Sequence, residues 1–307
     1  MSTTTHAKTI LITGASAGIG RDTAIRLAER GHRIIATARR REKLEALASE
    51  HAGITAVPLD VTDASSIARA RTSVLELTDG YGVDAIINNA GYGQIGPLEL
   101  IDDEALRRQF DTNVFGLMAV TRAFLPEMRE RGHGRVVNIS SLGGRIAFPL
   151  MGAYTATKFA LEALSDSLRL ELRPFGVRVV LIEPGVIRTE FADTAINSTS
   201  TLGQGSVYQP ALERLEQLNA QMHRTAVSTR TVTRAIQAAI ERRRPRARYV
   251  APVFAGLGVG LLRRLPTALT DWLMRSFAGL TPKRLVHATS GQARLTDRAA
   301  SAERRAA

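Results

Sequence analysis

The stretch TILITGASAGIG, residues 9–20, joins an apolar, β-branched run to a glycine-rich turn and then to the start of a helical pattern. The apolar run predicts a buried strand. The three glycines after it predict a tight turn, and the helix that follows can point its first N–H groups at an anion. A strand, glycine turn and helix at the start of an α/β chain is typical of dinucleotide-binding folds. The predicted phosphate-contacting residues are Gly14, Ser16, Gly18, Ile19 and Gly20.

The same stretch also fits G-x-S-x-G, the elbow that presents a nucleophilic serine in a hydrolase. That elbow normally follows several strands and is followed by an acid and a histidine, whereas this one follows the first strand. His223 and His287 lie in poorly patterned segments. We therefore interpret Ser16 as a turn residue near the phosphates, and a serine hydrolase as the disfavoured alternative.

Composition narrows the chemistry. The 307 residues contain no cysteine, which excludes thiol nucleophiles, disulfides and cysteine zinc sites and is compatible with the cytoplasm. The six histidines are scattered, so we expect no metal site. The N-terminus lacks the apolar core of a signal peptide. The longest uncharged apolar run, 249–262, is shorter than the ~20 residues that a membrane span needs.

Charge divides the chain into two parts. Residues 1–223 carry 24 Lys and Arg against 25 Asp and Glu, whereas residues 224–307 carry 17 against 4. The pattern therefore indicates a nearly neutral globular body followed by a basic appendage.

Strand and helix patterns alternate along the body, which indicates a parallel sheet covered by helices on both faces. Strands are predicted at 8–13, 33–38, 54–59, 83–88, 136–140, 177–183 and 248–251, and helices at 41–50, 64–77, 104–131 and 154–172. We predict an α/β fold: one Rossmann-like, doubly wound domain over residues 1–252 with a seven-stranded parallel sheet, plus a basic helical C-terminal extension.

The end of the second strand predicts the cofactor. An NAD site favours an acid there, about 20 residues after the glycine turn, to hold the ribose 2′-hydroxyl. No acid occurs between Glu29 and Glu42. The strand is instead followed by three arginines, and we predict that Arg39 pairs with the 2′-phosphate of NADP(H). Arg40 and Arg41 are interpreted as a solvated charge run.

Tyr154 and Lys158 stand at i and i+4 on one face of a predicted helix. A free phenol, with a pKa of about 10, is a poor acid or base at neutral pH, and a nearby ammonium and a cationic nicotinamide would lower that pKa. Ser141 follows the fifth strand at the carboxyl edge of the sheet, where its hydroxyl can hold a substrate oxygen. Ser140 is the alternative candidate, with a strand-end cap as its ordinary role.

Asn113 lies inside the long predicted helix, where asparagine is unfavourable. Either a kink or a water site behind Lys158 would account for it.

These residues closely resemble the short-chain dehydrogenase/reductase family. The motifs that match are T-G-x-x-x-G-x-G at 13–20, Asp60-Val61, N-N-A-G at 88–91, Asn113, the Ser141/Tyr154/Lys158 spacing and P-G-x-x-x-T at 184–189. They occur in the family's order over residues 8 to about 190, and the set is far more specific than any single member.

The resemblance implies hydride transfer between a nicotinamide and a substrate carbon. It implies that Tyr154 exchanges the proton with the substrate oxygen and that Ser141 positions that oxygen. Lys158 would hold the nicotinamide ribose and acidify Tyr154, and Asn113 would anchor a relay water.

The resemblance also implies cofactor contacts along the sheet edge. Asp60 would meet the adenine amino group, Val61 would give a backbone contact, and Thr189 would meet the carboxamide or a phosphate. The remaining predicted cofactor residues are Asn88, Ala90, Gly91, Pro184 and Gly185, together with Tyr154 and Lys158. Sheet stabilisation is the alternative for 88–91, and a helix cap is the alternative for Thr189. We expect a homodimer or homotetramer.

The segment 190–225 is expected to form a mobile lid over the substrate. Residues 148–151 (FPLM) offer an apolar wall, with core packing as the alternative. We therefore predict an NADP(H)-dependent oxidoreductase that interconverts a carbonyl and an alcohol on an apolar small molecule, such as a steroid, a retinoid or a lipid. A non-catalytic, NADP-binding regulatory protein of the same fold is the alternative function.

Beyond the seventh strand, apolar residues recur at roughly helical spacing between 253 and 287, accompanied by arginines. A basic amphipathic helix with Trp and Phe can lie at a membrane interface, giving peripheral membrane contact. Packing on the domain and an oligomer contact are the alternatives. The arginine cluster at 242–248 lacks interleaved aromatics, so we expect no nucleic-acid binding. Residues 288–307 are expected to be a disordered tail.

Overall fold

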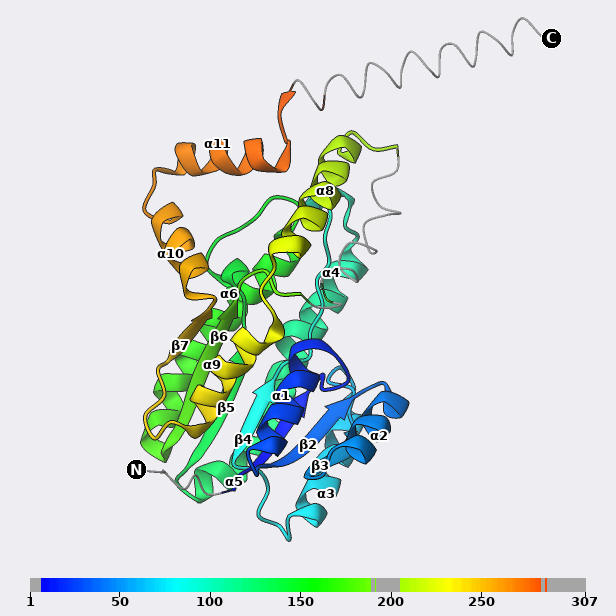
Figure 1. The fold of residues 1–307 in the computed structure, drawn as a ribbon, viewed down its shortest axis with the longest axis vertical. Coiled ribbons are helices and arrows are strands. Elements are labelled where there is room, and N and C mark those ends of the chain that lie inside the picture. The colour runs from blue at the N-terminus through cyan, green and yellow to red at the C-terminus, as the bar shows by residue number, and fades with distance from the viewer. Residues whose placement is uncertain (1–6, 189–190, 192–204, 283–284, 286–307) are drawn as a thin grey trace, which may run out of the picture.

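Seven parallel strands form the centre of the protein, with helices on both sides (Figure 1). In the computed structural model the described residues are 7–188, 191, 205–282 and 285, with no account of the side chains of 222–225. The strand order is β3-β2-β1-β4-β5-β6-β7. The strands are β1 (Thr9–Thr13), β2 (Arg33–Ala38), β3 (Ile54–Pro58), β4 (Ala85–Asn88), β5 (Gly134–Ile139), β6 (Val177–Pro184) and β7 (Arg248–Ala251).

Alternation along β1 divides the core between the two faces of the sheet. Ile10 and Ile12 pack on one face, against α1, α2 and α9, while Leu11 packs on the other, against α3, α5 and α6. The helices concerned are α1 (Gly18–Glu29), α2 (Arg41–Glu50), α3 (Ala64–Leu77), α5 (Leu117–Glu130), α6 (Gly152–Leu172) and α9 (Thr229–Glu241). Both faces are thus covered, as the near-continuous apolar strands predict, and the doubly wound fold is confirmed.

The long helix predicted at 104–131 is interrupted. It consists of α4 (Asp103–Phe110), a π-helical turn η2 (Asp111–Gly116) and α5. A π turn inserts an extra residue into the helical ladder, which re-aims the side chains within it. The turn contains Asn113, so the helix is irregular at the residue that is unfavourable in a regular helix.

After β6 the chain forms three elements at one end of the molecule (Figure 1). They are α8 (Gln209–Thr225), α10 (Val253–Leu262) and α11 (Thr267–Ala278). The predicted lid therefore contains a helix in its second half, whereas 192–204 lies outside the described residues. The predicted helical extension begins at α10, directly after β7, and the tail 288–307 lies outside the described residues. Within the described part of the chain, no helix is long and apolar enough to cross a membrane.

Candidate active site

The glycine turn after β1 has the geometry that a close backbone approach requires. Gly14 has φ +66°, a left-handed conformation that favours glycine. A Cβ on Gly20 would lie 2.4 Å from the Gly14 carbonyl oxygen and 2.5 Å from the Asn89 amide nitrogen. Any larger residue at position 20 would therefore push the turn away from α1.

Two residues absent from the predicted site hold this turn. The Thr13 hydroxyl accepts hydrogen bonds from the backbone N–H groups of Asn89 and Ala90, both at 3.0 Å. The Asn89 amide donates to the carbonyls of Thr13 at 3.0 Å and Gly14 at 3.2 Å. Both residues lie within the matched motifs, and their side-chain roles depend on β1 and β4 being neighbours, which the motif spacing alone does not reveal.

The N-terminus of α1 is open for an anion. Its N-cap is Ala17, which has no side chain that could accept from the first-turn N–H groups. Beside it, Ser16 accepts a hydrogen bond from Nε of Arg40 at 3.2 Å. The uncapped helix and the glycine cradle can hold the phosphates of a dinucleotide.

The arginines after β2 differ from their predicted roles. Arg40, interpreted from sequence as part of a solvated charge run, instead reaches the phosphate turn through Ser16. Arg39 is exposed and lies near Tyr92; burial raises the pKa of that phenol, and the Arg39 charge opposes the rise. Both arginines therefore lie at the end of β2, where a 2′-phosphate is predicted to bind, whereas the sequence argument assigned only Arg39 to it.

The side chain of Asn88 lies on the face of the sheet that α5 covers. Its amide nitrogen donates to the Thr121 hydroxyl and to the Asn138 side chain, both at 2.9 Å, and Asn138 donates in turn to the Ser165 hydroxyl at 2.9 Å. This buried chain of hydrogen bonds joins β4 and β5 to α5 and α6. The structural alternative given for Asn88 thus has direct support from the geometry, and Asn89 takes the position beside the turn.

Asp60 and Val61 follow β3 at the same edge of the sheet. The Asp60 carboxylate accepts from the backbone N–H of Thr62 at 2.9 Å and from its hydroxyl at 2.7 Å. A Cβ on Gly116 would lie 2.5 Å from the Val61 carbonyl oxygen, so η2 packs directly on this loop. Gly91 is equally close to Asn113: its Cβ would lie 3.0 Å from that amide oxygen.

Ser141 and Tyr154 meet at the carboxyl end of β5. Ser141 precedes the short helical turn η3 (Leu142–Gly144), and its hydroxyl accepts from the Gly143 N–H at 3.0 Å. Tyr154 lies in the first turn of α6, is buried, and shares a hydrogen bond with Ser141. The ring of Phe191 packs against the Tyr154 ring, with centroids 5.5 Å apart. The structure thus brings the predicted serine and tyrosine into direct contact.

Burial determines the protonation of Tyr154 and Lys158. It raises the pKa of Tyr154 to about 12, and the Ser141 hydrogen bond only partly opposes the rise. Burial lowers the pKa of Lys158 to about 8, opposed by the negative charge of Glu162. Lys158 donates to the Ile139 carbonyl at 2.8 Å, and its Nζ lies 5.6 Å from the Tyr154 ring centroid. In the protein without a bound cofactor, desolvation of the phenolate dominates the pKa of Tyr154, and the lowering expected from an ammonium together with a cationic nicotinamide stays a prediction.

The side chain of Asn113 is fully engaged. Its amide donates to the Tyr92 carbonyl at 2.9 Å and to the Thr157 hydroxyl at 3.2 Å, and its oxygen accepts from the Tyr92 N–H at 3.1 Å. Asn113 therefore fixes the loop after β4 against α6, one residue from Lys158. Because both amide donors are used, a relay water at the Asn113 side chain could only donate to its amide oxygen, and the backbone of Asn113 is the other position where such a water could bind.

An ion cluster lies behind Lys158 that the sequence did not suggest. Arg248, at the start of β7, pairs with Glu162 at 3.1 Å and Asp166 at 2.6 Å on α6, and with Glu183 at 3.2 Å on β6. Arg145 is 3.2 Å from the other oxygen of Glu183, whose side chain is completely buried. The cluster ties the helix that carries Tyr154 and Lys158 to the last two strands. Burial also raises the pKa of Glu162.

Apolar side chains pack on the segment that directly precedes the helix of Tyr154. Leu150 and Met151 pack with Ala211, Leu212 and Leu215 of α8. Phe148 packs in a second cluster with Leu142, Ile146 and residues of α10. The predicted apolar wall at 148–151 therefore connects the active-site helix to both the lid region and the extension.

The last predicted cofactor segment follows β6. Pro184 ends that strand, and the Gly185 N–H donates to the Ala251 carbonyl at 2.9 Å. Thr189 lies outside the described residues, so its predicted role stays a prediction. Among the residues that the structure describes, no group of three or more His, Asp or Glu side chains could hold a metal ion.

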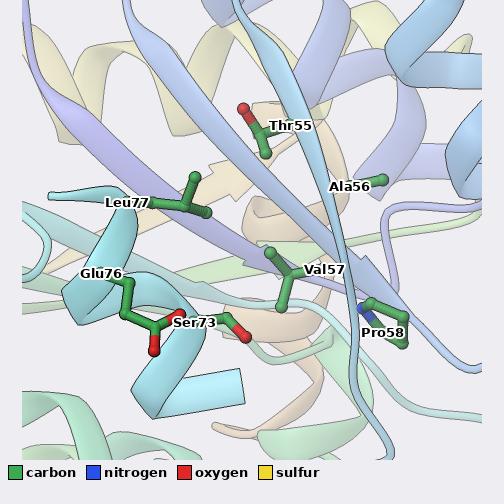
Figure 2. Close-up of a pocket in the computed structure, with 7 residues that line it drawn as sticks. All are labelled: Thr55, Ala56, Val57, Pro58, Ser73, Glu76 and Leu77. Atoms are coloured by element: carbon green, nitrogen blue, oxygen red, sulfur yellow. The ribbon is translucent and has the colours of Figure 1, made fainter. Parts of the chain in front are cut away.

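A hollow of about 430 Å³ lies elsewhere, beside the edge strand β3 and α3 (Figure 2). Its lining residues are Thr55, Ala56, Val57, Pro58, Ser73, Glu76 and Leu77. Glu76 is the one ionisable group among them, and none of the residues described above lines it. The chemistry of the site therefore points to the carboxyl edge of β1, β4, β5 and β6 instead.

Comparison with known proteins shows the family to which the chain belongs. Residues 8–199 match the family model described as short chain dehydrogenase, so the chain belongs to the short-chain dehydrogenase/reductase family of oxidoreductases. The uncharacterized oxidoreductase YbbO of Escherichia coli is 37% identical over 270 residues, covering 87% of this chain and 94% of that protein. The 3-ketodihydrosphingosine reductase of Bacteroides thetaiotaomicron is 35% identical and covers 87% of this chain and 97% of its own length.

Solved structures agree on the fold. A short-chain dehydrogenase from Streptomyces avermitilis is 36% identical with a TM-score of 0.72, covering 90% of this chain and 98% of that chain. A short chain dehydrogenase from Burkholderia cenocepacia, solved in complex with NADP, is 27% identical with a TM-score of 0.66, covering 87% of this chain and 98% of that chain.

A further relative by sequence is human 17-beta-hydroxysteroid dehydrogenase type 1. It is 41% identical over a shorter stretch, which covers 62% of this chain and 60% of that protein.

Proposed function

We propose that this protein is an NADP(H)-dependent oxidoreductase that interconverts a carbonyl and an alcohol on an apolar, lipid-like small molecule. One observation carries the proposal: the hydrogen-bonded Ser141–Tyr154 pair, with Lys158 behind it, lies at the sheet edge that also bears the uncapped glycine turn. When bound there, the nicotinamide supplies or accepts a hydride.

The chain's own residues then manage the oxygen and its proton. Ser141, whose hydroxyl is already oriented by the Gly143 N–H, holds the substrate oxygen. A phenol whose pKa is raised to about 12 is protonated at neutral pH, so Tyr154 is ready to donate a proton to the alkoxide that forms during reduction. Lys158, with a pKa lowered to about 8, changes charge near neutral pH more readily than an exposed lysine and can supply charge beside the phenol. Asn113 would contribute a relay water through its backbone.

NADP(H) is proposed because Arg39 and Arg40 follow β2 where an NAD site would have an acid. The NADP complex of the Burkholderia cenocepacia relative supports the choice. Removing both arginines by Arg39→Ala/Arg40→Ala should raise the Kd for NADPH by roughly 10²- to 10⁴-fold and leave NADH affinity nearly unchanged, since each of the two charge-assisted bonds contributes about 1.5–3 kcal/mol. Arg41→Ala, an exposed arginine beside them, is the control. Equal losses for NADPH and NADH in the double variant would reject the assignment.

The apolar clusters on the segment that directly precedes the helix of Tyr154 support an apolar substrate. The names of two relatives, a 3-ketodihydrosphingosine reductase and a 17-beta-hydroxysteroid dehydrogenase, agree with this class. The test is NADPH oxidation with a panel that contains a long-chain keto-amine, a steroid ketone, retinal and a short water-soluble ketone. We expect the highest kcat/KM for an apolar member. A clear preference for the short soluble ketone would contradict the proposed substrate class.

We also propose a homodimer or homotetramer. Phe115 and Phe159 are large, exposed apolar side chains, on η2 and α6, that a second copy could cover. Light scattering on the purified protein measures the assembly, and a monomer at micromolar concentration would contradict it.

A further inference from the structure

The helices α10 and α11 present a large apolar surface to solvent. Seven of their side chains are 42–71% exposed, although each would favour burial. They are Val253, Phe254, Leu257 and Leu261 on α10, and Leu269, Trp272 and Phe277 on α11. We call these seven residues the apolar rim. Exposed apolar groups of this number, gathered on two consecutive helices, mark an interaction surface rather than ordinary scatter.

Helix α10 is apolar on both of its faces. Val259, Ala255 and Leu262 face the domain and pack with Leu142 and Ile146. Phe254, Leu257 and Leu261, spaced by three and four residues, share the other face. The inner face is thus accounted for by the core, whereas the outer face needs a second partner.

The charges around the apolar rim are positive. Arg263, Arg264 and Arg275 are exposed, and Asp271 is the one acid between 253 and 282. In a symmetric dimer built on this surface, the arginines of both copies would meet in a single interface. An anionic lipid surface, in contrast, attracts arginines and takes up Phe and Trp side chains at the level of its headgroups.

The segment that follows these helices is poor in apolar side chains. Residues 286–307 contain Val286 and Leu295 as their only large aliphatic side chains, with four arginines among polar residues and alanines. A segment of that kind cannot bury seven large apolar groups.

The apolar rim borders the active site. Val259, on the inner face of α10, packs with Leu142, the residue after Ser141. Leu280 and Leu285, beyond α11, pack in one cluster with Leu150 and Met151, just before the helix that carries Tyr154. α11 also contacts α8, and the three helices stand together at one end of the molecule (Figure 1).

We propose that the apolar rim docks on an anionic lipid bilayer, with α10 and α11 lying in the plane of its interface. The site then opens beside the membrane surface, so that an apolar substrate can pass from lipid to Tyr154 without crossing water. This last part rests on the proposed function; the docking itself does not.

The test is sedimentation of the full-length protein with phosphatidylcholine vesicles that contain phosphatidylserine, and with pure phosphatidylcholine vesicles. We expect wild type to pellet with the anionic vesicles and less at high salt. The variant Phe254→Ser/Leu257→Ser/Trp272→Ser should bind at least about tenfold more weakly, because it removes the main apolar anchors. Arg263→Gln/Arg264→Gln should weaken binding by roughly fivefold for each arginine.

The matched control is Leu170→Gln/Phe175→Ser, which removes two exposed apolar side chains near the other end of α6 and should pellet like wild type. Thermal melting of every variant confirms folding without relying on any reaction. Wild type that stays in solution with anionic vesicles, or a triple variant that pellets as well as wild type, would overturn the proposal. A wild-type dimer that the triple variant converts to a monomer, without vesicle binding by either, would assign the apolar rim to a second copy instead. Failure to find a reductase substrate would leave the sedimentation result unaffected.

Discussion

The site edge, formed by the carboxyl ends of β1, β4 and β5, the helix α6 and the Arg248 cluster behind it, contrasts with α10 and α11, the helical part of the appendage. At the site edge, side-chain hydrogen bonds hold Thr13, Asn89 and Ser141 in place, and glycines stand where a Cβ would clash. In the appendage, glycines 258 and 260 have nothing within 4 Å of an added Cβ, and large apolar side chains are exposed. The site edge is specified by its own packing, whereas the described residues provide no such packing for the outer face of the appendage. Substitutions of one residue type in both regions should therefore have very different effects.

The largest difference is expected for arginine. Arg248→Met removes the cation shared by Glu162, Asp166 and Glu183, and leaves two buried carboxylates poorly compensated. The free energy of unfolding should fall by about 3–5 kcal/mol. Arg263→Gln, an exposed arginine of the appendage, should change it by less than about 0.5 kcal/mol. Urea denaturation measures both, and similar losses in the two variants would mean that the Arg248 cluster contributes nothing special.

The protonation of Lys158 should appear in the pH dependence of stability. Its pKa is about 8 in the folded protein and near 10.5 when unfolded, so the unfolded chain binds more protons between these values. The free energy of unfolding therefore rises as pH increases from about 8 towards 10.5, and the penalty for burying the charge is fully present below that window. In Lys158→Met the rise should be smaller, by on the order of 2 kcal/mol. Lys8, whose pKa is also lowered to about 8, keeps its own contribution in both proteins. If the free energy of unfolding of wild type and of Lys158→Met changed with pH in the same way, the lowered pKa of the buried Lys158 would be contradicted.

Glycine-to-alanine substitutions should have the smallest effects on stability, but with opposite signs in the two regions. Gly20→Ala places a methyl group 2.4 Å from a backbone oxygen, and should lower stability by about 1–3 kcal/mol and weaken NADPH binding. Gly258→Ala, in the open part of α10, should raise stability by about 0.5–1 kcal/mol, because alanine is the better helix former. Thermal melting compares them, and two shifts of the same sign would show that the regions do not differ in the way described.

The same contrast explains what the sequence could predict. The strands of the sheet, the glycine turn and the Ser141, Tyr154 and Lys158 set follow from local patterns and motif spacing, so they were predictable. The roles of Thr13 and Asn89 were not, because they depend on which strands are neighbours. Arg40 was misjudged because its reach to Ser16 depends on the path of the chain after β2.

The balance between burial and charge at the site, and contacts between residues distant in sequence, were harder still to predict. The sequence argument expected Lys158 and a cationic nicotinamide together to lower the pKa of Tyr154, and it did not anticipate that burial of the phenol raises this pKa in the protein without a cofactor. The Arg248 cluster joins residues 145, 162, 166, 183 and 248, whose proximity no local pattern reveals. The helices α8 and α9 fall in a stretch for which no strong motif guided the prediction.

The most direct test of the central claim is Tyr154→Phe. NADPH-dependent reduction of the best carbonyl substrate is measured alongside NADPH binding, in wild type and variant. The substitution removes only the hydroxyl that meets Ser141, so kcat should fall by roughly 10²- to 10⁴-fold while the Kd for NADPH stays close to that of wild type. A variant that keeps wild-type kcat would show that proton transfer does not pass through Tyr154, and the proposed site would be wrong.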